Sequence, residues 1–457
     1  MLAGFASAIA LAEAATPQAA PAFKSLRYDE HYEYLRDPQR STSSLDALKF
    51  IPLDADGTSY LSLGGEMRQR FELIHHVAWG SGPEDDNGYL LQRYMLHADL
   101  HLGATRAFIQ LKSGLEEGRE GGPRPTDRDR IDLHQAFVDW SVMSAATSLL
   151  TLRLGRQELA YGSSRLVSNR DGPNVRLAFD GVKVILQSAG VQVHAFAVRP
   201  VRTRAGAWDD DSDQNAALWG IYANAPAEWL RGANMELYYL GLHRNQARFD
   251  QGSAEELRHS FGARIARRKS GWDYNVEGVY QFGTFGSARI RAWTLASDTG
   301  IQFAEHRLKP RLGLKVDITS GDRSRDTPEL QTFNPLFPRG AYFGEPALIG
   351  PANHVDLHPS VSLDFGAGLS LDLGWDRFWR ESAGDGIYGP SVNILRRGNA
   401  SAAHNVGDQA EAKLDWSLNR NLGIGADYAH FFSGRVLVQT GPGKDVDYLS
   451  VWASLRF

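Results

Sequence analysis

The chain has 457 residues, of which 42% are hydrophobic, and its formal net charge at pH 7 is −5. The absence of cysteine excludes disulfide scaffolds, thiolate metal sites and cysteine nucleophiles, and the charge balance argues against a nucleic-acid partner. After residue 15 no apolar stretch is long enough to predict a transmembrane helix. Two or three soluble domains or one large β-barrel fit this length, and a barrel needs apolar residues only at alternate strand positions.

The beginning of the chain resembles a secretory signal peptide. Residues 2–12 are small and apolar, and Ala12-Glu13-Ala14 has the small-x-small form of a cleavage site. No Lys or Arg precedes the apolar stretch, so we expect the signal peptide, residues 1–15, to lack its natural start. Residues 16–57 are predicted to form a polar, periplasmic N-terminal segment, with helix-forming residues in 28–35 and 45–49, and residues 58–457 to form the barrel.

From residue 61 onward, apolar and polar residues alternate. Trp272, Val276 and Phe282 alternate with Asp273 and Glu277, and the final strand pattern ends in the aromatic residue at position 457. One apolar face for lipid and one polar face for a lumen is the pattern of an outer-membrane strand. Eighteen such strands are predicted, near 61–72, 90–102, 105–112, 131–141, 150–155, 179–187, 191–199, 216–224, 235–243, 259–268, 272–282, 289–297, 311–318, 355–365, 369–376, 411–418, 422–428 and 449–457.

The alternative is a soluble sandwich whose charged face meets solvent. Three features favour an all-β, antiparallel transmembrane barrel of about 18 strands with long extracellular loops. They are the number of consecutive alternating segments, the signal-like start and the lack of a helical domain that would cover a sheet.

Long irregular stretches separate some of the predicted strands, and loops of this length are usually functional or disordered. The stretch 321–353 combines five prolines with Phe333, Phe337, Tyr342 and Phe343, which indicates a rigid loop. It either folds into the barrel as a constriction or packs externally on its neighbours, and the sequence leaves both open. The other long stretches are 116–130, 157–178, 201–214, 381–404 and 434–446.

Three arginines follow one predicted strand closely: Arg156, Arg170 and Arg176. Guanidinium groups bind carboxylates in a bidentate manner, and several weak sites along a lumen would attract a polyanion without trapping it. In the alternative interpretation these arginines pair with Glu158, Asp171 and Asp180 and brace the loop.

Several motifs resemble the alginate export family of outer-membrane β-barrel porins, and the resemblance covers about residues 27 to 457. It implies a monomeric 18-stranded barrel with an electropositive, arginine-bearing lumen that passes a uronate polysaccharide out of the periplasm. Arg153, Arg156 and Arg377 match family positions on strands. The motifs are Leu152-Arg153-Leu154-Gly155-Arg156-Gln157, Asn169-Arg170-Asp171, Phe179-Asp180-Gly181-Val182, Arg377-Phe378-Trp379-Arg380, Tyr60-Leu61-Ser62-Leu63-Gly64-Gly65-Glu66 and Phe333-Asn334-Pro335-Leu336-Phe337-Pro338-Arg339-Gly340.

The predicted lumen carries both signs of charge. Its acids include Glu66, Asp99 and Asp139, so the sequence supports an anion-permissive conduit better than one dedicated to a single polymer. The residues predicted to bind solute are Arg68, Arg70, Arg93, Arg106, Arg153, Arg156, Arg170, Arg176, Arg311, Lys315 and Arg377.

We therefore predict a channel of the bacterial outer membrane for anionic, carboxylated saccharides such as alginate. The alternatives are a general or small-solute uptake porin and a plugged structural or adhesive barrel. Outer-membrane lipid and periplasmic export proteins are the expected partners, the chain is expected to be a monomer, and no cofactor is predicted. No enzyme is predicted, because no Gly-x-Ser-x-Gly elbow accompanies the histidines.

One acidic run lies in a predicted loop. Asp209, Asp211 and Asp213 offer carboxylate oxygens of the kind that calcium prefers. The alternative is a solvated acidic loop, and the sequence does not decide between the two.

Overall fold

The computed structural model describes residues 21–457 except 146, 231 and 269. The predicted signal peptide, residues 1–15, lies outside the described residues. No helix in the described part of the chain is long and apolar enough to cross a membrane.

Eighteen antiparallel strands form a closed β-barrel, which confirms the predicted fold class and strand number. Each strand pairs with the spanning strands before and after it in sequence. The strands are β2 (Ser59–His75), β3 (Asp85–Leu102), β4 (Thr105–Glu117), β5 (Asp129–Ala145), β6 (Ser148–Gln157), β7 (Phe179–Ser188), β8 (Val191–Arg202), β10 (Ala216–Ala227), β11 (Ala233–Phe249), β12 (Gly252–Arg267), β13 (Gly271–Phe285), β14 (Ala288–Gln302), β15 (Arg311–Thr319), β17 (His354–Gly366), β18 (Leu369–Trp379), β21 (Asn405–Ser417), β22 (Leu422–Ser433) and β23 (Val446–Arg456).

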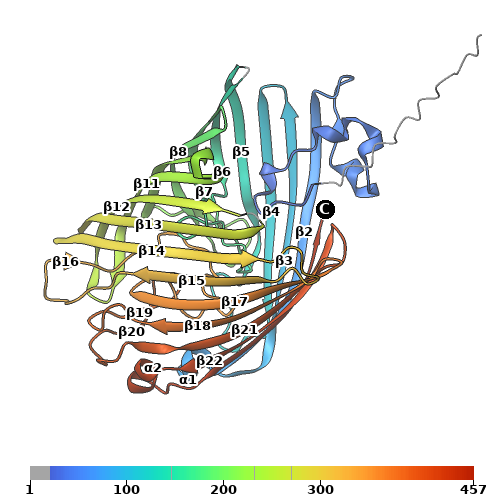
Figure 1. Cartoon of the computed structure of the whole chain (residues 1–457). Helices are drawn as coiled ribbons and strands as arrows, with labels where there is room; N and C mark the ends of the chain where they lie inside the picture. Colours follow the sequence, from blue (N-terminus) through green and yellow to red (C-terminus); the bar gives the residue numbers. More distant parts are fainter. Residues whose placement is uncertain (1–20, 146, 231, 269) are drawn as a thin grey trace, which may run out of the picture.

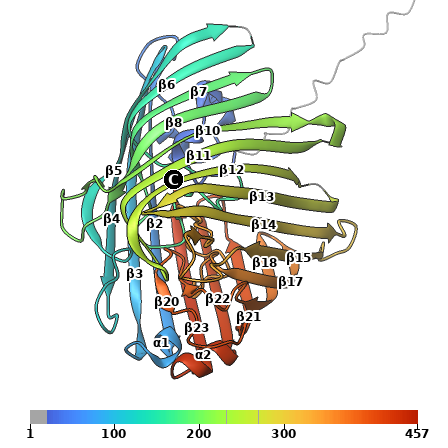
Figure 2. The ribbon, with the colours of Figure 1, turned by 90° about the vertical axis from the view of Figure 1, so that its left-hand side faces the viewer.

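The first and last spanning strands close the barrel. β2 pairs with β23 in a register that places Glu66 opposite Arg456 and Leu73 opposite Leu449. In Figures 1 and 2 the blue and red ends of the chain accordingly lie side by side. Closure leaves no free sheet edge. A β-protein that spans a membrane requires this, because lipid cannot form hydrogen bonds with an unpaired strand.

The alternation in sequence becomes two faces of the wall. Leu96 and Trp272 point outward and are 58% and 55% exposed. Arg93 and Glu277 point inward and are buried. Because large apolar side chains are exposed on every spanning strand, lipid is the solvent that suits this face.

Short helices, 3₁₀ turns and strands of two or three residues lie before or between the spanning strands. The helix formers of 28–35 and 45–49 do not produce α-helices, because each segment is too short to sustain one; they form 3₁₀ turns instead. The short elements are η1 (Arg27–Asp29), η2 (Glu33–Arg36), η3 (Pro38–Arg40), η4 (Ser44–Leu48), β1 (Ile51–Pro52), α1 (Val77–Gly80), β9 (Asp211–Ser212), η5 (Glu228–Leu230), β16 (Glu329–Leu330), β19 (Ile387–Tyr388), β20 (Ile394–Arg396) and α2 (Arg435–Thr440).

The N-terminal segment lies against the rim that holds the chain terminus, which we call the N-terminal rim. Arg27 donates to the main-chain oxygens of Phe457 at 2.8 Å and of Gly65 at 3.1 Å, and Lys49 donates to that of Leu63 at 2.9 Å. In Figure 1 this blue segment and the helices α1 and α2 lie at opposite ends of the barrel.

The long connections 158–178 and 320–353 leave the opposite rim and turn into the barrel. Leu159 and Leu166 of the first, and Phe333 and Leu336 of the second, are buried in one apolar cluster. Inward-facing residues of the wall, such as Leu240, complete that cluster. The interior therefore has a hydrophobic core of its own, which fixes both loops inside the barrel.

A charged residue placed on the lipid-facing surface should lower the free energy of unfolding, and by more near the middle of the membrane than near the rim. Leu96→Arg near the middle of β3 should lower the free energy of unfolding by about 2–4 kcal/mol, because the guanidinium would enter hydrocarbon. Leu102→Arg lies beside the turn at the N-terminal rim and is the matched control, with an expected cost of about 0–1 kcal/mol. Reversible unfolding in lipid vesicles measures both, and equal costs would contradict the assigned faces.

Candidate functional site: a constriction in the barrel lumen

Two wall arginines hold the loop 158–178 across the lumen. Arg68 of β2 donates to the main-chain oxygens of Asp171, Gly172 and Pro173 at 3.0, 3.0 and 2.9 Å. Arg93 of β3 donates to the oxygen of Asp171 at 2.8 Å and to that of Pro173 at 3.2 Å. We call this set of contacts, from Arg68 and Arg93 to residues 171–173, the loop clamp.

The loop clamp belongs to a larger charge network. Arg93 also pairs with Glu66 at 2.9 Å and with the carboxylate of Asp171 at 2.8 Å. Glu66 contacts Arg456 at 3.1 Å. These contacts join the closing strands β2 and β23 to the loop.

Arg176 completes the network from within the loop. It contacts Glu158 at 2.7 Å and Asp171 at 3.5 Å. Burial raises the pKa of the Asp171 carboxyl, but Arg176, Arg93 and Arg68 outweigh burial and hold that pKa well below its usual range. The network thus contains four guanidinium groups and three carboxylates, which leaves one positive charge in excess.

The two inward loops are joined to each other. The backbone NH of Phe337 donates to the oxygen of Leu166 at 2.8 Å, and that of Arg339 to the oxygen of Ser164 at 3.0 Å. Arg165 donates to the hydroxyl of Tyr342 at 2.6 Å. Loops 158–178 and 320–353 therefore form one constricting body, and of the two placements left open by the sequence, 321–353 adopts the one inside the barrel.

Glu345 ties that body to the barrel wall at β2 and β21. Its carboxylate contacts Arg70 at 2.9 Å and Lys413 at 2.8 Å. Burial raises the pKa of Glu345, but the positive charges of Arg70 and Lys413 outweigh burial and lower the pKa to about 2. The loop approaches closely here because Gly344 has a φ of +110°, and a Cβ at that position would lie 2.2 Å from Glu411.

The constriction lies between two cavities. The N-terminal cavity, of about 330 Å³, is lined by Tyr28, Tyr161 and Lys183 among others. The loop-side cavity, of about 590 Å³, is lined by Arg170 and Glu345 among others. Loop 158–178 lines both cavities, the first with residues 160–162 and the second with Arg170 and residues 172–174.

Most of the arginines predicted to bind solute are paired with acids. Arg153 makes a bidentate contact with Asp139, with both distances 2.7 Å, and Arg156 contacts Asp180 at 2.8 Å. Of the three arginines at or after the end of β6, Arg156 and Arg176 thus pair with acids as the bracing interpretation expects, whereas Arg170 makes no ion pair within the described residues. The remaining paired members are Arg70 with Glu72 and Glu345, Arg93 with Glu66 and Asp171, Arg106 with Asp99, Arg176 with Glu158, and Arg311 with Asp273 and Asp298.

Three of the predicted cations make no ion pair within the described residues and contact main-chain oxygens instead. Arg68 belongs to the loop clamp, and Arg170 donates to the oxygen of Pro338 at 3.2 Å. Lys315 donates to the oxygen of Tyr342 at 3.1 Å and lies 4.4 Å from the ring centroid of Phe343.

The expected lumen position of Arg377 is wrong. Its side chain is 53% exposed on the outer face and lies 3.4 Å from Asp408. Arg377 shares the parity of Leu373 and Trp375, which are exposed outward, whereas Asp376 and Phe378 are buried. The strand alternation itself dictates the outward direction.

The structure does not gather Asp209, Asp211 and Asp213 into the expected calcium site. Asp211 pairs with Arg202 at 2.7 Å and Arg204 at 2.8 Å. Among the described residues, the three carboxylates that lie close together are those of Asp129, Asp132 and Asp210. The ammonium group of Lys112 lies 2.7 Å from both Asp129 and Asp210, so a cation of the protein already compensates this cluster.

Several residues that build the constriction carry no signal in the sequence. Arg165 and Glu345 connect the loops to the wall, Arg456 pairs with Glu66 on the neighbouring strand, and Tyr28 enters the lumen from the N-terminal segment. Tyr28 packs on Phe137 at a ring distance of 5.4 Å, and its hydroxyl donates to the oxygen of Glu158 at 2.8 Å. Loop residues have no periodic pattern, so only the folded chain reveals these partners.

A buried acid pair joins loops 320–353 and 380–404. Asp385 accepts hydrogen bonds from the hydroxyls of Thr332 at 2.5 Å and Tyr388 at 2.6 Å, and from the backbone NH of Asp322 at 2.8 Å. Burial, and then the neighbouring Asp385, raise the pKa of Asp322 to about 7.

The raised pKa makes the packing of these loops pH-dependent. The folded state favours protonated Asp322. The stability that Asp322 contributes to these loops is therefore complete below the usual carboxyl pKa and is lost as the pH rises through about 7. Hydrogen-exchange protection of both loops should be lower at about pH 8.5 than at about pH 5.

Two variants make this prediction specific. Asp322→Asn should remove most of the pH difference in protection, whereas Asp326→Asn, which changes an exposed acid of the same loop, should retain it. Equal protection at both pH values in the unaltered protein would contradict the prediction.

The comparisons with known proteins agree with this geometry. The model of a protein family described as alginate export matches residues 59–451. No curated protein matches the chain.

Solved structures from Pseudomonas aeruginosa share the fold. OpdK with vanillate has a TM-score of 0.58 at 12% identity, and the match covers 87% of this chain and 98% of OpdK. OccK2 (OpdF) in complex with glucuronate has a TM-score of 0.57 at 12% identity, with 86% and 98% covered. OpdO has a TM-score of 0.56 at 13% identity, with 90% and 98% covered.

Proposed function

The chain belongs to the alginate export family and lies in the bacterial outer membrane, and from this we propose that it is a channel for anionic, carboxylated saccharides such as alginate. The solute would pass the constriction formed by loops 158–178 and 320–353. Diffusion along its own gradient suffices, because a barrel of this kind has no energy source.

The excess positive charge at the loop clamp carries the proposal. Within the described part of the chain, Arg68 contacts only main-chain oxygens and makes no ion pair. Its guanidinium group therefore keeps a full charge beside loop 158–178, where it is buried and the surroundings screen it little. A carboxylate that replaces one of the carbonyl contacts forms a charge-assisted hydrogen bond, which is stronger than the one it displaces.

The paired arginines of the wall fit a conduit better than a tight binding site. Conduction requires sites that are favourable enough to enter and weak enough to leave. Arg153 and Arg156 are largely compensated by Asp139 and Asp180, so each offers an anion only modest attraction. Many weak sites of this kind would let a polyanion move on.

Two of the similar structures support a carboxylated solute. OpdK was solved with vanillate and OccK2 in complex with glucuronate, and both ligands are carboxylates. The neighbours share only the fold with this chain, so their ligands are support for the chemical class alone.

Uptake of small carboxylates is the second candidate. The two inward loops are bonded to each other, and the cavities on either side have volumes of about 330 and 590 Å³. Such volumes suit single sugars or small acids more readily than a long polymer. A plugged structural barrel is the third candidate. It predicts that the protein carries no current in a planar bilayer.

We further propose that the protein acts without catalysis, as a monomer, and that periplasmic export proteins give polymer transport its direction. The outward apolar face meets outer-membrane lipid. Each of these statements rests on the proposed channel function.

Ion selectivity tests the function. In a planar bilayer under a salt gradient, the unaltered protein should show a reversal potential that favours anions, and oligouronates should block its current. Arg68→Gln should shift the reversal potential toward cations, and Arg68→Lys should restore most of the preference.

Arg377, which lies on the outer face, provides the control. Arg377→Gln removes the same charge from the outer face and should leave the reversal potential unchanged. A non-selective current that is indifferent to oligouronates would overturn the carboxylated-saccharide assignment and favour a general porin, and no current at all would favour the plugged barrel.

A further inference from the structure

The lumen wall beside the N-terminal rim presents polar side chains in rows set by the strand register. Gln187 of β7 is opposite Gln192 of β8, and Gln192 is opposite Asn224 of β10. These three amides form the row at the rim. The Gln187 and Gln192 side chains line both the N-terminal cavity and an open ledge of about 500 Å³ at the turns beside it.

The next two rows lie deeper in the lumen. His194 is opposite Ile185 and Tyr222. One pleat further in, Lys183 is opposite both Arg153 and Phe196. A solute that enters at this rim therefore meets amides first, then the imidazole, and then cations.

Lys183 differs from its charged neighbour. It is 5% exposed, and within the described residues its ammonium group makes no ion pair; it lies 5.4 Å from the ring centroid of Tyr161. Arg153 beside it is held by Asp139. A buried cation without a partner is costly, so Lys183 is the group in this wall that gains most from an anion.

Two further polar atoms in the cavity are also without a partner among the described residues. The hydroxyl of Tyr161 and Nε2 of His194 are buried and make no hydrogen bond. Buried polar atoms are nearly always hydrogen-bonded, so these atoms call for a ligand hydroxyl or a water molecule. Tyr161 is fixed in place by stacking between Phe196 and Tyr222, at ring distances of 5.5 and 4.6 Å.

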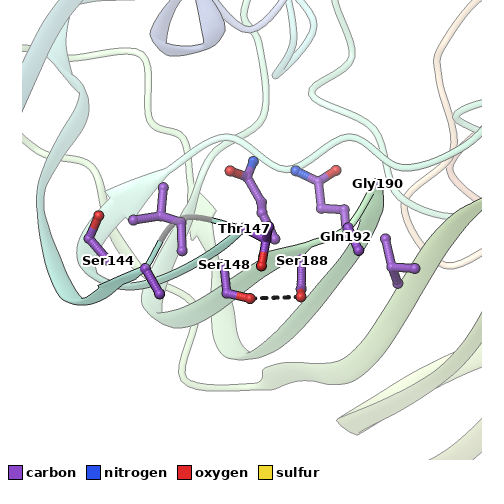
Figure 3. A pocket seen from close by; sticks show the side chains of 11 residues that line it. Ser144, Thr147, Ser148, Ser188, Gly190 and Gln192 are labelled. Carbon is purple, nitrogen blue, oxygen red and sulfur yellow. Dashed lines mark hydrogen bonds between the residues drawn. The ribbon is translucent and has the colours of Figure 1, made fainter.

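The cavity ends at the constriction and opens at the rim. Gly162 brings loop 158–178 against the wall, where a Cβ would lie 2.6 Å from the hydroxyl of Tyr222. At the rim the cavity shares Leu149, Gln187 and Gln192 with the ledge. Figure 3 shows this ledge, with Ser148 and Ser188 joined by a hydrogen bond of 2.8 Å and Gln192 near it.

We propose that this cavity and its ledge are a docking site for one uronate residue, at which a carboxylated saccharide is held before it reaches the loop clamp. Lys183 binds the carboxylate, and the side chains of Gln187, Gln192, His194 and Tyr161 bind sugar hydroxyls. The site rests on the proposed function and adds to it a defined place of first binding.

The chemistry of the rows fits such a ligand. Amides donate and accept hydrogen bonds at once, as sugar hydroxyls do, whereas the ammonium group selects the carboxylate. The volume of about 330 Å³ lies at the small end of ligand pockets, which suits one sugar ring with its carboxylate. Removing Lys183 leaves no carboxylate that depended on it, so a variant there should fold.

The test is the block of single-channel current by an oligouronate added on the side of the N-terminal rim. Lys183→Gln should raise the half-blocking concentration by at least about tenfold. Lys309→Gln is the matched control, because it removes an exposed lysine of another turn at the same rim, and it should leave the value unchanged. A neutral oligosaccharide of equal length should block both variants and the unaltered protein equally.

The outcomes separate the two proposals. Block of the unaltered protein with the same affinity in Lys183→Gln would overturn the docking site and leave the channel function intact. Absence of block in the unaltered protein would instead overturn the carboxylated-saccharide function. A half-blocking concentration that rises equally in Lys183→Gln and Lys309→Gln would also overturn the site, because general surface charge would then explain the effect.

Discussion

The interior of this barrel depends on guanidinium groups that hold main-chain oxygens of a loop. Arg68 and Arg93 bind the backbone of residues 171–173, and a backbone carbonyl attracts a guanidinium without neutralising it. Arg68 therefore holds the loop and keeps its charge, whereas Arg93 is also paired with Glu66 and Asp171. Had carboxylates alone held the loop, the same mechanical result would have cost the lumen its excess charge.

The remaining interior follows from that clamp. Once loop 158–178 crosses the lumen, it offers an edge on which Phe337 and Arg339 of loop 320–353 form backbone hydrogen bonds. Apolar side chains of both loops then pack on inward-facing wall residues. Glu345 adds a second attachment to the wall, through Arg70 of β2 and Lys413 of β21. The lumen is thus divided into two cavities with different linings, and loop 158–178 faces both.

The sequence is sufficient to predict the strands of the barrel wall, but not the contacts that the loops make inside the lumen. Strand alternation is local, since each side chain faces lipid or lumen by parity, and this predicted eighteen strands and the direction of residues such as Trp272 and Glu277. Loop contacts are not local: Arg165 meets Tyr342 across 177 positions, and nothing near either residue indicates the other. For Arg377 the resemblance to a family outweighed the parity of its own strand, and the parity was right.

The single-channel conductance of an Arg68→Gln/Arg93→Gln double variant shows whether the loop clamp forms the constriction. Arg456 and Arg176 still compensate Glu66 and Asp171 in that variant, so the barrel should remain folded. We expect a larger conductance than in the unaltered protein, because loop 158–178 loses the guanidinium contacts that attach residues 171–173 to β2 and β3. An unchanged conductance in a correctly folded double variant would contradict this expectation.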